Sequence, residues 1–370
     1  MSALRRFFFS SEGWPYLLSP FIVAAIVLRA AGADASLIFA MAAIGLIPAA
    51  AVMGRATEEL AARSGPGIGG LLNVTFGNFP ELIIAILALN EGLQEVVKAS
   101  LVGSVIGNIL LVMGAAMFIG GLKRDRQTFN ATAAQAQSSM LVLAMAALVM
   151  PAVYELVQGT GLPSPGSVSN NYDPTVEKLS AIACIFLLIS YIGGLIFSLV
   201  THRDLFNPVH EDEEGEFAWP VRRSVGVLAG ASVVVGVMSE ILVGSIEEAS
   251  HAIGLSEFFV GAFVIAIVGN AAEHWVAVLV AYKNKMDLAV NIAIGSAAQV
   301  ALFVAPVLVL LSLFVGPHPM PLVFNGFELA GLLIALITAN MITADGESTW
   351  FEGLQLLSLY AVIGTAFYFA

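Results

Sequence analysis

The sequence predicts an all-α polytopic membrane protein with 11 transmembrane helices, one extra helix followed by two inverted five-helix repeats. Three observations predict this fold class. The composition is 58% hydrophobic and only 11% charged, with a mean hydropathy of +0.90, whereas soluble domains are about 25% charged. Apolar runs fill nearly all of the 370 residues. A polar motif recurs in the two halves of the chain.

The apolar runs lie between polar or Gly/Pro-rich breaks. Each is close to the length of about 20 residues that a helix needs to cross a bilayer core. We predict helices near residues 14–30, 35–57, 67–89, 96–121, 128–153, 177–200, 223–246, 257–282, 287–313, 322–342 and 350–370.

The basic residues test this number of helices, since a missed helix would scramble the sidedness of every later loop. With these spans, all of the 15 Lys and Arg residues except Arg29, Lys98 and Lys178 fall on the side of the N-terminus. The distribution predicts a cytoplasmic N-terminus and an outward-facing C-terminus. We expect the chain to lie in the cell membrane.

The chain divides into four parts: an N-terminal extra transmembrane helix (1–31), a first five-helix repeat (35–200), an acidic cytoplasmic linker (201–221) and a second repeat (222–370). An odd number of helices in each repeat turns the second upside down relative to the first. The net charge of -12 argues against a nucleic-acid partner, because phosphates need a basic surface. The single cysteine, Cys184, excludes a disulfide framework and a thiolate metal site. No cofactor is predicted.

Two short motifs repeat with a constant offset. GNFPE occupies residues 77–81 and GNAAE occupies 269–273, so 192 residues separate Glu81 from Glu273. The next span of each half has a Gly-Ser pair, and 192 residues also separate Ser104 from Ser296. Inverted repeats of this kind characterise secondary transporters, whose sites lie near the midplane where the repeats meet.

The paired motifs place oxygen ligands inside the bilayer. An Asn and a Glu three residues apart share a helix face, so Asn78 with Glu81, and Asn270 with Glu273, present an amide oxygen beside a carboxylate. Both glutamates fall near the middle of their spans, where a charge costs roughly 2.5 to 3.5 kcal/mol and normally faces the bundle interior. Two carboxylates among amide, hydroxyl and carbonyl oxygens form the ligand set that Ca2+ prefers.

The glycines and the proline of the motifs predict locally opened helices. Gly77 and Gly269 let a neighbouring backbone approach, and Pro80 frees an upstream carbonyl. Opened helices could supply carbonyl ligands, as broken helices do in transporters. Further polar residues near mid-span are Asn108, Ser296 and Gln299.

Protons should compete with the metal for these oxygens. Burial favours the protonated carboxylates in an empty site, whereas a bound cation favours the ionised ones. This competition is the minimal machinery of an antiporter. The structural alternative is a protonated Glu-Glu pair that serves packing. His274 fits a proton relay as well as a hydrogen bond to a neighbouring helix, and Leu82 replaces it in the first motif.

Three other functions compete with proton-coupled exchange. A sodium-driven exchanger could use the same fold, and a cation channel could use acidic residues to select cations. An intramembrane enzyme is disfavoured, because the chain contains no HExxH motif and no Ser/His or paired-Asp site at matching depth.

The motifs resemble those of the calcium/proton exchangers (CAX) of the cation/calcium antiporter superfamily. GNFPELIIAI and GNAAEHWVAVLVA resemble the two repeat signatures, and GSAAQVALFVAP resembles the continuation of the second. Sodium/calcium exchangers of the superfamily usually read GTSxPE, which favours proton coupling here. The resemblance implies Ca2+ and H+ as substrates, Glu81 and Glu273 as shared ligands, and Asn78 and Asn270 as supports. It implies further site-lining residues at His274, Ser104, Ser296 and Gln299.

Other acidic residues form a second rank of candidates. Six lie within or at the ends of spans, where they could line access paths for the ion: Glu58, Glu59, Glu240, Glu247, Glu248 and Glu328. Four more lie in the linker: Glu211, Asp212, Glu213 and Glu214. The linker is either a solvated loop or, as the resemblance implies, an acidic helix that attracts or senses calcium at the cytoplasmic mouth.

Overall fold

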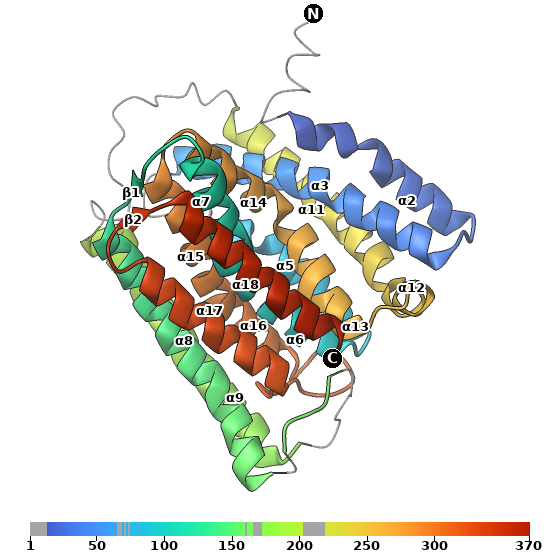
Figure 1. The fold of residues 1–370 in the computed structure, drawn as a ribbon. Coiled ribbons are helices and arrows are strands. Elements are labelled where there is room, and N and C mark those ends of the chain that lie inside the picture. The colour runs from blue at the N-terminus through green and yellow to red at the C-terminus, as the bar shows by residue number, and fades with distance from the viewer. Residues whose placement is uncertain are drawn as a thin grey trace, which may run out of the picture. The chain divides into compact units, whose positions relative to one another are not determined.

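The computed structural model describes residues 13–64, 69, 72, 75–159, 161–165, 172–202 and 219–370, and these are nearly all helical (Figure 1). The α-helices are α2 (Pro20–Ala30), α3 (Ala35–Arg63), α5 (Phe79–Asn90), α6 (Gln94–Ile106), α7 (Met113–Gly121), α8 (Ala131–Gln158), α9 (Pro174–Ile196), α11 (Val221–Val243), α12 (Ile246–Ile253), α13 (Glu257–Phe259), α14 (Ala266–Tyr282), α15 (Met286–Gln299), α16 (Ala305–Leu311), α17 (Gly326–Ile342) and α18 (Trp350–Tyr368).

The remaining elements are short. A 3-10 helix, η1 (Trp14–Leu18), precedes α2. The π-helical segments are η2 (Gly107–Val112), η3 (Phe197–Thr201), η4 (Val260–Ile265) and η5 (Val300–Val304). Two strands, β1 (Gln127–Thr128) and β2 (Glu347–Ser348), pair antiparallel.

The helices follow the apolar runs of the sequence. In the described part of the chain, 8 helical stretches are long and apolar enough to cross a membrane. Three shorter apolar helices, Trp14–Ala30, Phe79–Asn90 and Gly326–Ile342, lie where the other spans are predicted. Several membrane-length helices are therefore present, and the number of eleven spans stays a prediction.

The chain forms two compact units, each with segments from both predicted repeats. The first contains residues 1–87, 195–255 and 268–272. Its centre is α3, against which α2, α11 and α12 pack. α3 begins after Asp34, whose carboxylate accepts the N–H groups of Ser36 and Leu37 at 2.9 and 3.3 Å and so caps the helix.

The second unit contains residues 88–194, 256–267 and 273–370. α6 lies at its centre, buried along almost its whole length, and packs against η4, α15 and α17. Gly103 makes the contact with η4 possible, because a Cβ there would lie 1.9 Å from the carbonyl oxygen of Ala262. α18 packs along α7 (Figure 1).

The outer surface of the second unit is apolar along α9. Ile182, Phe186, Ile189 and Ile192 are all exposed on this helix. A large exposed apolar face on a membrane-length helix is typical of a membrane interaction surface. This exposure agrees with the predicted bilayer environment.

Two details differ from the predicted spans. The span predicted to end at residue 246 ends with α11 at Val243, and Glu247 and Glu248 lie in the first turn of the separate helix α12. The β1–β2 pair joins the segment after α7 to the segment before α18, with Gln127 opposite Ser348. Strands of two residues have no periodicity from which the sequence could predict them.

Candidate ion-binding site

The first motif lies where a helix is interrupted. Residues 75–77 are helical, Asn78 forms a buried turn, and α5 begins at Phe79. Pro80 fits the first turn of α5, where a proline loses no intrahelical hydrogen bond. The local opening expected at this motif is found. Glu81 therefore lies in the first turn of a helix, where the helix dipole stabilises a carboxylate.

Glu81 binds a residue of the second motif. The Asn270 side chain donates an N–H from Nδ2 to Glu81 Oε1 at 2.5 Å, and both residues belong to the first unit. We expected each asparagine to act with the glutamate of its own motif. This hydrogen bond joins the asparagine of the second motif to the glutamate of the first, and the shared role of each pair within one motif stays a prediction.

The second motif lies in an unbroken helix. α14 runs from Ala266 to Tyr282 directly after the π-helical segment η4, so the opening expected at Gly269 is not found. Gly269 has a different role. A Cβ there would lie 3.3 Å from Glu81 Cγ, closer than most side-chain contacts. The glycine therefore gives the Glu81 side chain its space.

A chain of hydrogen bonds leads to Glu273 within the second unit. Ser296 Oγ, on α15, donates to Glu273 Oε2 at 3.2 Å, and Asn108 Nδ2 donates to Ser296 Oγ at 3.1 Å. Asn108 and Ser296 are buried, and Glu273 is half-buried. Asn108 lies in η2, and π-helical turns of this kind are frequent at functional sites. The structure thus brings together three of the predicted residues.

The other predicted residues lie close to these in the chain. Ser104 is buried on α6, one turn before Asn108, and Gln299 is half-buried at the end of α15, one turn after Ser296. Gly77 is half-buried directly before the turn at Asn78. His274 Nε2 is buried without a hydrogen-bond partner among the described residues.

The second-rank acidic residues have different surroundings. Glu59 is buried, pairs with Arg55 at 3.6 Å and accepts the backbone N–H of Trp219 at 3.4 Å. Glu328 is also buried, whereas four others are exposed: Glu58, Glu240, Glu247 and Glu248. The linker residues Glu211, Asp212, Glu213 and Glu214 lie outside the described residues.

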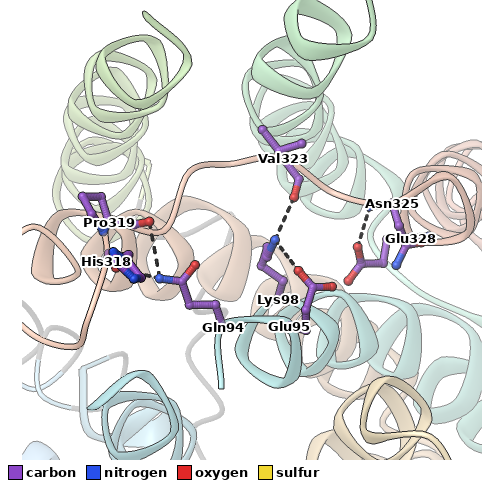
Figure 2. A network of polar contacts seen from close by, with 8 residues as sticks. All are labelled: Gln94, Glu95, Lys98, His318, Pro319, Val323, Asn325 and Glu328. Atoms are coloured by element: carbon purple, nitrogen blue, oxygen red, sulfur yellow. Dashed lines mark hydrogen bonds and ion pairs between the residues drawn. The ribbon is translucent and has the colours of Figure 1, made fainter. Parts of the chain in front are cut away.

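One buried polar cluster is not predicted from the sequence. It joins the first turn of α6 to the segment before α17 through Gln94, Glu95, Lys98, Asn325 and Glu328, all buried (Figure 2). From the sequence alone, Lys98 serves to assign sidedness and Glu328 is a candidate for the ion's access path. The sequence does contain a signal for the ion pair of this cluster, since Glu95 and Lys98 are three residues apart and can pair on one helix face.

The chain is similar to known proteins over most of its length. The model of the sodium/calcium exchanger protein family matches residues 35–200 and 223–369. The chain belongs to this family. The Ca(2+)/H(+) antiporter ChaA of Bacillus subtilis (strain 168) is 44% identical to it over 337 residues, which cover 90% of this chain and 92% of the relative.

Two further similarities support this membership of the exchanger family. The Ca(2+)/H(+) antiporter of Synechocystis sp. (strain ATCC 27184 / PCC 6803 / Kazusa) is 42% identical over 353 residues, covering 90% of this chain and 91% of the relative. The crystal structure of the selenium-substituted Ca2+/H+ antiporter protein YfkE matches with a TM-score of 0.80 at 38% identity, covering 96% of this chain and 98% of that one. This exchanger therefore has the fold of a solved transporter.

Proposed function

We propose that the chain is a secondary active transporter that exchanges Ca2+, or a similar divalent cation, for H+ across a membrane. Two relatives at 42% and 44% identity have the name Ca(2+)/H(+) antiporter. The observation that carries the proposal is the hydrogen bond from Asn270 to Glu81, because it links polar side chains of the two repeated motifs. The relatives are transporters, so the chain is not assigned an enzymatic reaction.

In this proposal Glu81 and Glu273 are shared between metal and protons. Ca2+ takes 6 to 8 oxygen ligands, and ionised carboxylates supply the charge that it needs. Protons that arrive at the two carboxylates displace the metal, so each ion is carried when the other is absent. Two carboxylates would take two protons for each Ca2+, which keeps the charge of the site constant through the exchange. Alternating access then exposes the site to one side of the membrane at a time.

Supporting roles belong to the polar residues around the glutamates. Asn78 and Asn270 orient ligands, Gly77 gives the metal site a backbone carbonyl, and Gly269 gives room to the Glu81 side chain. The buried Nε2 of His274, without a hydrogen-bond partner among the described residues, supports a role in proton coupling. The residues that line the site are Ser104, Asn108, Ser296 and Gln299.

We also propose eleven spans with two inverted repeats, a cytoplasmic N-terminus and a location in the cell membrane. The family model matches two separate stretches, 35–200 and 223–369, which have nearly the bounds of the proposed repeats. The π-helical segments η2 and η5 begin at Gly107 and Val300, close to the 192-residue offset of the motifs. Residues 1–31 would then form the extra helix and 201–221 the cytoplasmic linker.

The acidic residues outside this centre would attract the cation. The exposed side chains of Glu58, Glu240, Glu247 and Glu248 support such a role, because exposed acidic groups raise the local concentration of cations. Glu59 would instead fix the end of α3 through its contacts with Arg55 and Trp219. We assign residues 211–214 of the linker to calcium attraction or sensing at the cytoplasmic mouth.

The experiment compares Ca2+ uptake by proteoliposomes under an imposed pH gradient. Glu81→Gln and Glu273→Gln should each abolish uptake, because an amide neither binds a proton nor supplies charge to the metal. Glu347→Gln is the matched control, since this residue belongs to neither motif and its side chain pairs with Arg126 at 2.9 Å. Normal uptake by both variants would reject the proposal. Uptake that follows a sodium gradient and ignores pH would identify a sodium-driven exchanger, and flux without counter-transport would identify a channel.

A further inference from the structure

A second group of buried ionisable side chains lies within the second unit. Lys98 is 2% exposed, and its Nζ lies 2.7 Å from Glu95 Oε1 and donates to the carbonyl oxygen of Val323 at 3.1 Å. Gln94 Nε2 donates to the carbonyl oxygen of His318 at 2.6 Å. The first turn of α6 is thereby tied to the segment before α17 (Figure 2).

Glu328 enters the same cluster from α17. It is fully buried and forms a capping box with Asn325, in which Glu328 Oε2 accepts the Asn325 N–H at 2.8 Å and Asn325 Oδ1 accepts the Glu328 N–H at 2.9 Å. The charges that act on Glu328 are those of Lys98 and Glu95. The capping box thus gives a hydrogen-bond donor to Oε2 of Glu328 but none to Oε1.

Two carboxylate oxygens of this cluster have no donor. Glu95 Oε2 and Glu328 Oε1 are buried, and neither has a hydrogen-bond partner among the described residues. In the view of Figure 2 the two carboxyl groups point toward one another. Like charges that face one another in a buried site cannot both stay ionised. A single proton bound to either carboxyl group would remove this repulsion.

The three ionisable groups Glu95, Glu328 and Lys98 among themselves lack one positive charge. Glu95 and Glu328 together would have two negative charges, and Lys98 supplies one positive charge. Lys98 Nζ lies 5.7 Å from the ring centroid of Tyr172, and burial raises the pKa of the Tyr172 phenol, which therefore stays neutral. Two other acidic groups lie on neighbouring helices: Glu155 on α8, whose charge acts on Tyr172, and the half-buried Glu257 on α13, which packs against α6.

We propose that Glu95 and Glu328 together bind one proton, at a site separate from Glu81 and Glu273. A metal ion fits this place poorly, since the ammonium of Lys98 already occupies the cation position beside Glu95. The proton completes a neutral cluster that holds the first turn of α6. It stays bound when Ca2+ is exchanged, because no charge of the cluster changes in that step. The cluster therefore differs from the coupling site, where protons come and go with every cycle.

The test uses infrared spectroscopy on the full chain in detergent micelles. A protonated carboxyl group has a C=O stretching band that shifts in D2O, and this band should persist at neutral pH in the Glu81→Gln/Glu273→Gln double variant. It should be lost in that background on Glu328→Gln and, separately, on Glu95→Gln. Glu352→Gln is the matched control, because Glu352 holds the same capping-box position in α18 with Thr349 and is only half-buried. This variant should keep the band.

Thermal unfolding gives a second readout. At neutral pH the folded chain would hold a proton that the unfolded chain releases. The unfolding midpoint should therefore fall as the pH rises toward the value at which the folded chain also loses this proton. Glu328→Gln should remove that fall, and Glu352→Gln should keep it. A band that survives both Glu328→Gln and Glu95→Gln would overturn the proposal. So would a band that disappears when Ca2+ or Na+ is added at constant pH to the double variant. If Glu328→Gln does not fold, Glu95→Gln and the unmodified chain decide the question with the same measurements.

Discussion

Glu81 and Glu273 each receive a hydrogen bond from a neutral side chain. Asn270 donates to Glu81 at 2.5 Å and Ser296 donates to Glu273 at 3.2 Å. A donor that binds a carboxylate favours its ionised form over its protonated form. Both donors therefore favour the form that binds a metal, and their removal should weaken metal binding more than proton binding.

Asn270→Ala should lower the apparent Ca2+ affinity about tenfold to a hundredfold, since a hydrogen bond to a charged group contributes about 1.5 to 3 kcal/mol. The measurement is the Ca2+ concentration that gives half-maximal uptake in proteoliposomes. Asn340→Ala serves as control, because Asn340 Nδ2 donates within its own helix, to the carbonyl oxygen of Leu336 at 3.1 Å. An affinity that is equal in both variants would show that the Asn270 contact has no part in the site.

Ser296→Ala should have a smaller effect, about tenfold, because its hydrogen bond to the Glu273 carboxylate is longer, at 3.2 Å, and so belongs at the lower end of the range of about 1.5 to 3 kcal/mol. The change also removes the acceptor of Asn108, so the Asn108→Ala/Ser296→Ala double variant should be less impaired than the two single effects added together. The same uptake assay measures all three. Ser358→Ala is the control, since this exposed hydroxyl donates only to Leu354 of its own helix. Strictly additive effects would argue against a connected chain.

At the residue scale the sequence singles out the two glutamates as candidates, but it does not contain their hydrogen-bond partners. A carboxylate within an apolar run is conspicuous, and the 192-residue repeat singled out Glu81 and Glu273. The i,i+3 rule describes neighbours on one helix, so it paired Asn270 with Glu273. The contact that forms joins residues 189 positions apart, and no local spacing contains that information.

At the scale of elements, α6 depends on close approach to η4. The missing side chain of Gly103 lets the two backbones touch, because a Cβ would lie 1.9 Å from the carbonyl oxygen of Ala262. Gly103→Ala should therefore reduce stability by about 3 kcal/mol, the upper part of the range for overpacking, since backbone must move. Thermal unfolding in detergent is the measurement.

Gly107→Ala is the matched control for this contact. Gly107 lies one turn further along and a Cβ there meets nothing within 4 Å. Alanine is favoured over glycine in a helix by about 1 kcal/mol, so this change should leave the unfolding midpoint equal or raise it. Equal losses in both variants would contradict the close contact between α6 and η4.

The sequence could predict the places of the helices because apolar length is a strong signal. It could not predict the π-helical segments or the break at Asn78. A π turn shifts the backbone register by one residue without changing the composition. Pro80 indicated an irregularity near the first motif, whereas Gly269 indicated an opening that α14 does not have.

At the scale of the whole molecule, composition predicted a membrane protein and the motifs predicted cation exchange. The two compact units could not be read from the repeats, because each unit takes segments from both halves of the chain. Duplication is a property of the sequence, whereas the units follow from contacts between distant segments. Residues 268–272 and Glu273 therefore belong to different units although they are adjacent in the chain.

Proton movement driven by Ca2+ tests the central claim most directly. Proteoliposomes that contain the purified chain and a pH-sensitive dye receive external Ca2+ in sodium-free medium, with the membrane potential clamped. We expect Ca2+ to enter while the lumen becomes more alkaline, because protons leave in exchange, and we expect Glu81→Gln to show neither change. Ca2+ entry with a constant internal pH would contradict proton-coupled exchange.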